Sequence, residues 1–221
     1  MKYLLNCICQ QDVVELPQDV GIRIVAGHGL AAVVSQVEES TRGPSISSLL
    51  AFEKVVEAID ARQTVIPMRY GCLMESEEQV VQLLEAHRQE YETLLIRLRG
   101  MTEMGIRLLW PASVPALLGP PKSQGAAYLA SLRNRYQQDT LAKEEILLAD
   151  RIVAALARWF VEQRREVSSS DQGRLLSLSF LMQKIHVGEF REAVRNVSTP
   201  PGVKLLMSGP WPPYNFVAPA D

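Results

Sequence analysis

Two kinds of apolar spacing follow one another along this chain of 221 residues. Alternating apolar and polar residues predict strands, and apolar residues three or four positions apart predict helices. The predicted strands are 1–9, 22–26, 30–37, 65–68, 105–110, 176–182 and 203–208. The predicted helices are 49–59, 76–100, a helical region at 123–166 with a break near 137–140, and 186–197. Because this order contains neither a regular βαβ alternation nor a repeat, the sequence predicts an α+β fold.

The region 76–100 gives the clearest helix prediction. Ser76 and Gln79 have capping-box spacing, and Gly100 supplies a stop signal at the other end. At 1.5 Å per residue, one continuous helix here is roughly 35 Å long. His87 falls on its apolar stripe, so we expect a buried or half-buried histidine and no ligand role.

The first predicted strand carries two of the three cysteines in the chain. Strict alternation places Cys7 and Cys9 with Leu5 on one face, which predicts a half-buried strand with ordinary buried thiols. A zinc site needs four ligands, and beyond Cys72 only three histidines could complete one. We therefore expect no metal, and reduced thiols in a cytosolic protein.

Composition narrows the functional classes further. The net charge of −2 argues against nucleic acid as the main ligand. Nowhere does the sequence approach the roughly 18 uncharged apolar residues of a membrane span. Phosphate-binding glycine motifs are missing, so we expect no cofactor. His28 lies between two glycines; a tight turn explains this arrangement as well as a catalytic histidine does, and no nucleophile motif accompanies it.

Proline and glycine cluster at 111–121, which predicts the main domain boundary. We expect a mixed N-terminal α+β domain at 1–110 and a second α+β domain at 111–208. The second is compatible with a modified ferredoxin-like unit with added helices, and includes a polar loop at 168–170. An extended Pro/aromatic tail at 209–221 completes the prediction.

Two segments carry most of the information about function. The first, VIPMRYG at 65–71, ends in Arg69 and Tyr70, and Gly71 permits a turn with positive φ. The second, SGPWPPYNFV at 208–217, presents Trp211, Tyr214 and Phe216 between prolines. An arginine at a strand end can pair with a carboxylate or a chain terminus, but we favour a structural corner for the first segment. The tail can lie along a groove of its own chain or of a partner.

These segments resemble the GvpL/GvpF family of gas vesicle proteins. The resemblance covers nearly the whole chain, through MKYLLNCI at the start, GLAAVVSQV at 29–37, VIPMRYG, LRGMTEMGIRL at 98–108 and the closing GPWPPYNFV. Tyr70 stands where the family often has Phe. Phe52 replaces a frequent His before Glu53, which weakens any catalytic or ligand role for that helix.

The resemblance implies an accessory protein of gas vesicles and no enzyme. Its expected partners are the major hydrophobic shell protein, whose nucleation and assembly it would assist by preventing aggregation, and other gas vesicle accessory proteins. No catalytic residue carries over; Arg69, Tyr70, Trp211, Tyr214 and Phe216 are the candidate structural or interaction residues. The alternative is a small-ligand-binding regulator with a ferredoxin-like domain, and a hydrolase using His28 is a third hypothesis.

Overall fold

The computed structural model describes residues 2–11, 21–37, 45–111, 143–170 and 173–217. The chain divides into two compact units. Unit 1 comprises residues 1–103 together with 211–221, and unit 2 comprises residues 104–210. The C-terminal segment therefore belongs to the same unit as the N-terminus. The predicted division at 1–110, 111–208 and 209–221 stays a prediction, and most of the proline cluster behind it lies outside the described residues.

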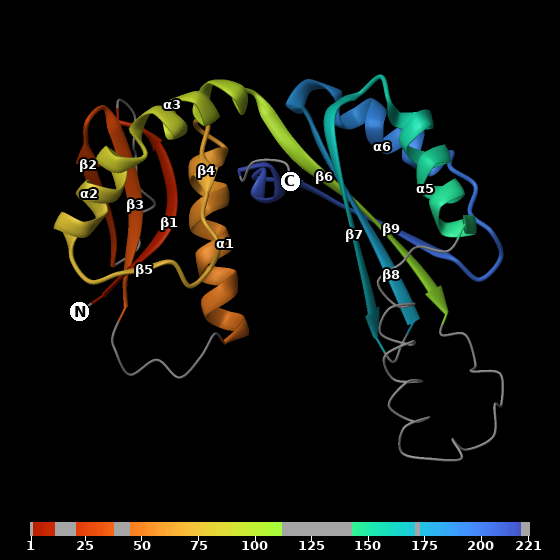
Figure 1. Ribbon diagram of the computed structural model, residues 1–221, viewed down its shortest axis with the longest axis horizontal. Helices are drawn as coiled ribbons and strands as arrows, with labels where there is room; N and C mark the ends of the chain where they lie inside the picture. Colours follow the sequence, from red (N-terminus) through yellow and green to blue (C-terminus); the bar gives the residue numbers. More distant parts are fainter. Residues whose placement is uncertain (1, 12–20, 38–44, 112–142, 171–172, 218–221) are drawn as a thin grey trace, which may run out of the picture. The chain divides into compact units, whose positions relative to one another are not determined.

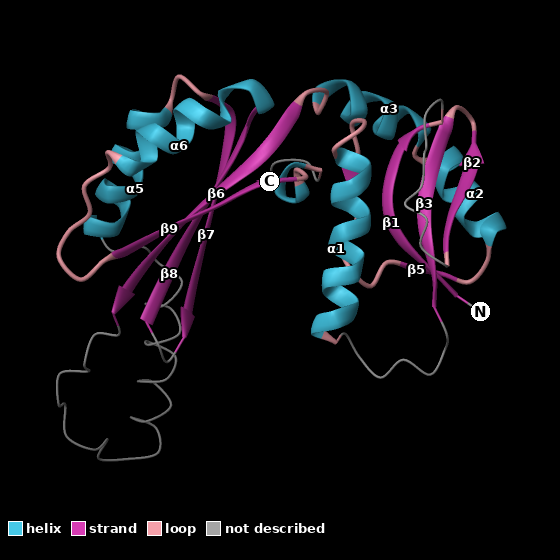
Figure 2. Cartoon of the chain, turned by 180° about the vertical axis from the view of Figure 1, so that it is seen from behind, coloured by secondary structure: helices cyan, strands magenta, loops and turns pink. Residues whose placement is uncertain are grey.

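Unit 1 is built on a sheet whose strands run in the order β2-β3-β1-β4, with β5 also pairing with β1. The strands are β1 Lys2–Gln10, β2 Ile22–Gly27, β3 Leu30–Val37, β4 Ile66–Pro67 and β5 Leu73–Met74. Helix α1, Ile46–Asp60, lies on one side of this sheet, and α2, Glu77–Ala86, lies on the other (Figure 1, Figure 2).

The central strand β1 is buried on both faces, so the predicted half-buried strand is wrong. Its register against β3 shifts between Leu5 and Cys7, which is a β-bulge at Asn6. After the bulge, Cys7 packs with Leu4 in the apolar cluster under α1, and Leu5 packs with Ile8 in the cluster under α2. Simple alternation fails here because one extra residue moves the later side chains to the opposite face.

The predicted continuous helix from Ser76 to Gly100 is two helices in the structure. Helix α2 ends and α3, Arg88–Arg97, begins at His87, whose φ of −110° and ψ of 17° are not helical. His87 is exposed, contrary to prediction, and its Nδ1 lies 3.0 Å from Glu90 Oε2. Buried residues of both helices belong to one apolar cluster, among them Val80, Leu84, Tyr91 and Leu95.

The β2–β3 hairpin explains why His28 lies between two glycines. Gly27 pairs with Leu30, so the loop has two residues, and both have positive φ: 56° at His28 and 82° at Gly29. Positive φ at both positions is the signature of a type I′ turn, which matches the twist of antiparallel strands. The tight turn predicted from Gly-His-Gly is confirmed.

Unit 2 holds a sheet in the order β7-β8-β6-β9, with helices α5, Lys143–Leu156, and α6, Val187–Arg195, against one face (Figure 1). The strands are β6 Met101–Pro111, β7 Phe160–Ser170, β8 Gly173–Gln183 and β9 Lys204–Trp211. The first three residues of β6 and the last residue of β9 belong to unit 1. A single-turn helix η1, Lys184–His186, follows β8. The predicted inward residues of α5 and α6, such as Ile152 and Phe190, are buried as expected.

Strand β7 was missed, because residues 160–166 were predicted helical and 168–170 a loop. Its side facing the helices carries Gln163 and Arg165 opposite the buried Phe180 and Leu178 of β8. Polar residues at these positions hide the strand alternation. Arg165 is tolerated there because its Nη2 lies 2.6 Å from Asp150 Oδ1 on α5.

No helix among the described residues is long and apolar enough to cross a membrane. That finding covers α1, α2, α3, α5 and α6.

The type I′ turn predicts how substitutions at His28 affect stability. His28→Val should lower the free energy of unfolding by about 1–2 kcal/mol, because a β-branched side chain strongly disfavours positive φ. His28→Asn should change it little, since Asn tolerates this conformation. Urea unfolding of both variants beside the wild type measures the difference, and equal stabilities for Val and Asn would contradict the turn assignment.

Candidate interaction site

The VIPMRYG segment forms a corner at the edge of the unit 1 sheet. Ile66 and Pro67 make up β4 and pair with Ile8 and Cys7 of β1. Since Pro67 has no N–H to donate, a place on an outer strand suits it. The next donor, the N–H of Met68, bonds to the Asn6 carbonyl over 2.9 Å. The predicted short edge strand is therefore confirmed.

A tight turn then follows at Arg69–Cys72. The Cys72 N–H donates to the Arg69 carbonyl over 3.3 Å, and Gly71 has a φ of +99°. Positive φ at the third turn residue is the position at which a type II turn favours glycine. The side chain of Arg69 is exposed.

Tyr70 holds the beginning of α1. Its ring meets Phe52 edge to face with centroids 5.4 Å apart, and its hydroxyl donates to Ser48 Oγ over 3.0 Å. Ser48 also belongs to the capping box with Ser45 that starts the helix. The corner thus fixes where α1 begins on the sheet.

The aromatic tail packs on its own unit. Pro212 and Pro213 are buried, and Phe216 has no exposed surface. The predicted fully extended segment is wrong in part, because Tyr214–Phe216 form a single 3-10 turn, η2. Proline fixes φ near −65°, which suits the start of such a turn as well as an extended strand.

Three side chains of unit 1 form hydrogen bonds with the main chain of this segment. We call them the tail cradle: Arg97, Thr102 and Glu103. Thr102 Oγ1 donates to the Trp211 carbonyl over 3.0 Å, and Arg97 Nη2 donates to the Phe216 carbonyl. The Glu103 carboxylate accepts from the Asn215 N–H over 3.0 Å and from Asn215 Nδ2 over 2.5 Å. Glu103 is only 5% exposed, so this carboxylate is committed to the tail.

Tyr214 lies beside β1 and α1. It packs on the cluster that contains Cys7, Phe52 and Val56. Burial raises its pKa well above 10, and the nearby charges of Glu53 and Glu57 act in the same direction. Among the described residues, its buried hydroxyl has no hydrogen-bond partner.

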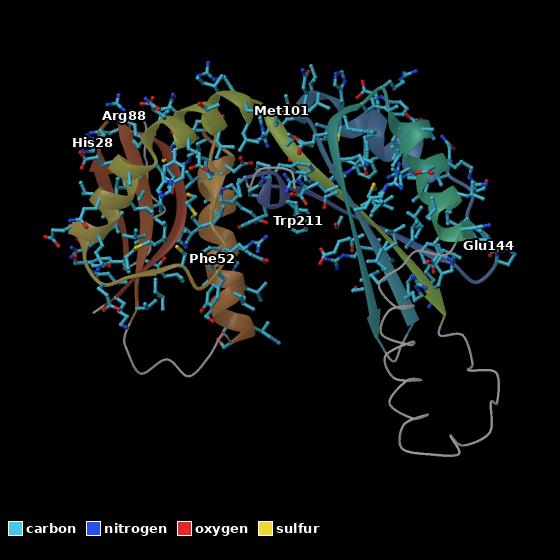
Figure 3. The ribbon with its side chains drawn as sticks, in the orientation of Figure 1. His28, Phe52, Arg88, Met101, Glu144 and Trp211 are labelled. Carbon is cyan, nitrogen blue, oxygen red and sulfur yellow. The ribbon has the colours of Figure 1, made fainter. Side chains whose placement is uncertain are left out.

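The two segments singled out in the sequence meet at one place. Tyr70 and Tyr214 both border the cluster beneath α1, and Phe216 is buried in the same unit. Arg69 is exposed. Trp211, which Figure 3 labels, keeps 41% of its surface exposed although its carbonyl is bonded. The docking of the tail on its own chain therefore accounts for Tyr214 and Phe216, while an interaction role for any of the five residues stays a prediction.

Sequence reasoning missed the tail cradle. Thr102 and Glu103 lie in a strand whose pattern gave no sign that a glutamate would be buried, and Arg97 lies in the last turn of a helix, where basic residues are common. Their only common feature is a partner more than 100 residues away. No local pattern could have revealed it.

The cysteines are unpaired thiols, as predicted. Cys7 and Cys9 are buried and Cys72 is half-buried. Burial raises the pKa of Cys9 to about 12 and that of Cys7 strongly in the same direction. Both therefore stay protonated near neutral pH, which disfavours nucleophilic chemistry. Within the described ranges, no group of three or more His, Cys, Asp or Glu side chains could hold a metal ion.

The burial of the tail predicts unequal effects of its aromatic residues on stability. Phe216→Ala should cost about 3–5 kcal/mol, because it empties a fully buried site. Trp211→Ala should cost less than Phe216→Ala, since 41% of the Trp211 surface is already exposed and its carbonyl bond survives. Chemical denaturation measures both values. Equal losses would contradict the described packing.

Tyr214 predicts a pH effect at alkaline pH. The raised pKa means that the unfolded chain loses this phenolic proton near pH 10, before the folded protein does, so stability falls as the pH rises above 10. Tyr214→Phe should be as stable as the wild type at pH 7, because it removes an unpaired buried hydroxyl. Its stability should fall less steeply above pH 10. Unfolding curves between pH 7 and 11 test this, and parallel pH profiles for both proteins would refute it.

Comparison with known proteins gives the same family over most of the chain. The family model described as "Gas vesicle synthesis protein GvpL/GvpF" matches residues 4–218. Gas vesicle protein F2 of Halobacterium salinarum is 22% identical over 87% of this chain and 78% of its own. Gas vesicle protein F of a Streptomyces species is 24% identical over 89% of this chain and 87% of its own.

Solved structures share the fold. The crystal structure of GvpF from Anabaena sp. PCC7120 has a TM-score of 0.74 at 17% identity, covering 100% of this chain and 97% of that one. GvpF from Microcystis aeruginosa gives 0.73 at 18% identity, covering 98% and 99%. The predicted α+β class is confirmed. The match over residues 4–218 shows that this chain belongs to the GvpL/GvpF family of gas vesicle synthesis proteins, whose site of action is the gas vesicle, a cytoplasmic organelle of prokaryotes.

Proposed function

We propose that this protein binds the major hydrophobic shell protein of the gas vesicle and assists its nucleation and assembly by preventing its aggregation. The observation that carries the proposal is the family match, which extends from residue 4 to residue 218. Association with other gas vesicle accessory proteins belongs to the same proposal. The protein would act by binding and not by catalysis.

A protein that shields an apolar client needs an apolar surface of its own. The first two turns of α1 offer one. Ile46 is 79% exposed, Leu50 51% and Leu49 37%. Positions separated by three and four residues lie on one side of a helix, so these side chains form a single surface, which we call the α1 apolar patch.

The surroundings of the α1 apolar patch favour a binding role. Tyr70 and the Ser45–Ser48 capping box hold the start of the helix in place, so the patch lies on a helix whose beginning is anchored by hydrogen bonds. One and two turns further along, Glu53 and Glu57 are exposed. These charges keep the rest of the helix surface hydrated and limit self-association of the free protein.

Among the described residues, a pocket in unit 1 bears on the alternative hypothesis, a small-ligand regulator. A pocket lined by Gln10, Gln63, Thr64, Leu95 and Arg99 encloses about 40 Å³. Pockets for metabolite-sized ligands usually measure about 300–1,000 Å³. This pocket has room for water-sized molecules and gives no reason to prefer a metabolite.

The α1 apolar patch predicts a defined loss of binding. The double variant Ile46→Ser, Leu50→Ser should reduce co-purification of the major shell protein at least tenfold, because each buried leucine-sized side chain contributes about 1.5–3 kcal/mol to an interface. Stability should change little, since both side chains are exposed in the free protein. Pull-down of co-expressed shell protein with tagged wild type and variant measures the effect.

Ile185→Ser, Leu147→Ser provides a matched control in unit 2. Ile185 is 77% exposed and Leu147 68%, so the same number of exposed aliphatic residues is removed. Normal capture by this control together with loss in the α1 variant supports the proposal. Capture lost equally in both variants would reject the α1 apolar patch as the binding surface, and no capture by the wild type would reject shell-protein binding itself.

A further inference from the structure

The contacts of the C-terminal segment have the character of a peptide in a binding site. The tail cradle makes hydrogen bonds to three main-chain groups of the segment: the Trp211 carbonyl, the Asn215 N–H and the Phe216 carbonyl. Main-chain contacts of this kind supply affinity in peptide recognition, and side-chain pockets supply specificity.

Specificity is visible at two neighbouring positions. The Asn215 side chain donates to Glu103 Oε1 over 2.5 Å, so the carboxylate recognises this amide and the main chain together. Phe216 is completely buried. The buried pair Pro212 and Pro213 restricts the free segment before it binds, which lowers the entropy cost of docking.

The covalent connection adds nothing to these contacts. The segment enters unit 1 between Pro210 and Trp211, and each of the cradle's hydrogen bonds is made to Trp211, Asn215 or Phe216, beyond that point. The bond to residue 210 therefore acts by raising the effective concentration of the segment. A segment of the same sequence from another molecule can form every one of the same hydrogen bonds.

We propose that the tail cradle is a peptide-binding site in its own right, and that it accepts the C-terminal segment of a second copy of this chain when its own segment is withdrawn. The ligand class is a proline-rich segment in which Asn-Phe follows the prolines, as in residues 212–216. Exchange of an identical element between copies needs no new interface. The proposal does not depend on shell-protein binding.

Two full-length variants test the exchange. The tail-defective variant, Asn215→Ala, Phe216→Ala, keeps an intact cradle; the cradle-defective variant, Arg97→Gln, Glu103→Gln, keeps an intact tail. A fluorescent peptide of residues 209–221 should bind the tail-defective variant at least tenfold more tightly than the wild type, whose cradle is occupied, or the cradle-defective variant. Mixing the two variants should give a 1:1 complex by light scattering, and each variant alone should give the mass of a single chain.

Binding of the peptide equally to all three proteins, or no binding to a folded tail-defective variant, would overturn the proposal. Circular dichroism checks that this variant is folded.

A second measurement avoids the folding question. A protease site inserted between Pro210 and Trp211 allows the segment to be cut after the protein has folded. We expect the cut segment to stay bound on gel filtration and to be displaced by excess peptide 209–221, but not by the same peptide with Phe216→Ala. Immediate loss of the cut segment would show that the cradle cannot hold it without the covalent link.

Discussion

The burial of β1 on both faces is the constraint on which unit 1 depends. A strand covered by α1 on one side and by α2 and α3 on the other must be apolar in both directions, and the bulge at Asn6 determines which residues point each way. The same strand pairs with β3, β4 and β5. Its position buries Cys7 and Cys9 and thereby raises the pKa of both thiols.

The two segments that carry the family resemblance serve this arrangement. The VIPMRYG corner pairs with β1 and holds the start of α1 through Tyr70, while the tail places Tyr214 against the same apolar cluster. Their aromatic residues are largely used inside the protein. The exposed apolar residues at the start of α1 are therefore better placed to meet a partner than the buried rings of the tail.

Several features could be predicted because local signals sufficed. The hairpin around His28 follows from two positions that require positive φ, and α1 follows from the spacing of Phe52, Val56 and Ile59. The errors have local causes too. In β1, a one-residue bulge interrupts the alternation of buried and exposed side chains. At His87, a non-helical backbone conformation divides what the apolar stripe predicted as one helix. In β7, the charged Arg165 occupies a position where a strand pattern needs an apolar residue, and its ion pair with Asp150 on α5 is visible only in the structure.

By itself, the sequence determined the α+β class, most elements and the family, because periodicity, turn residues and the two distinctive segments are all local properties. Only the tertiary structure decided that the C-terminus returns to unit 1 and that Glu103 is buried to receive it. The reason is physical: a carboxylate in a strand is stable in the interior only with donors at hand. The donors to Glu103 belong to Asn215, which lies 112 positions later in the sequence, so no local pattern can predict this pairing.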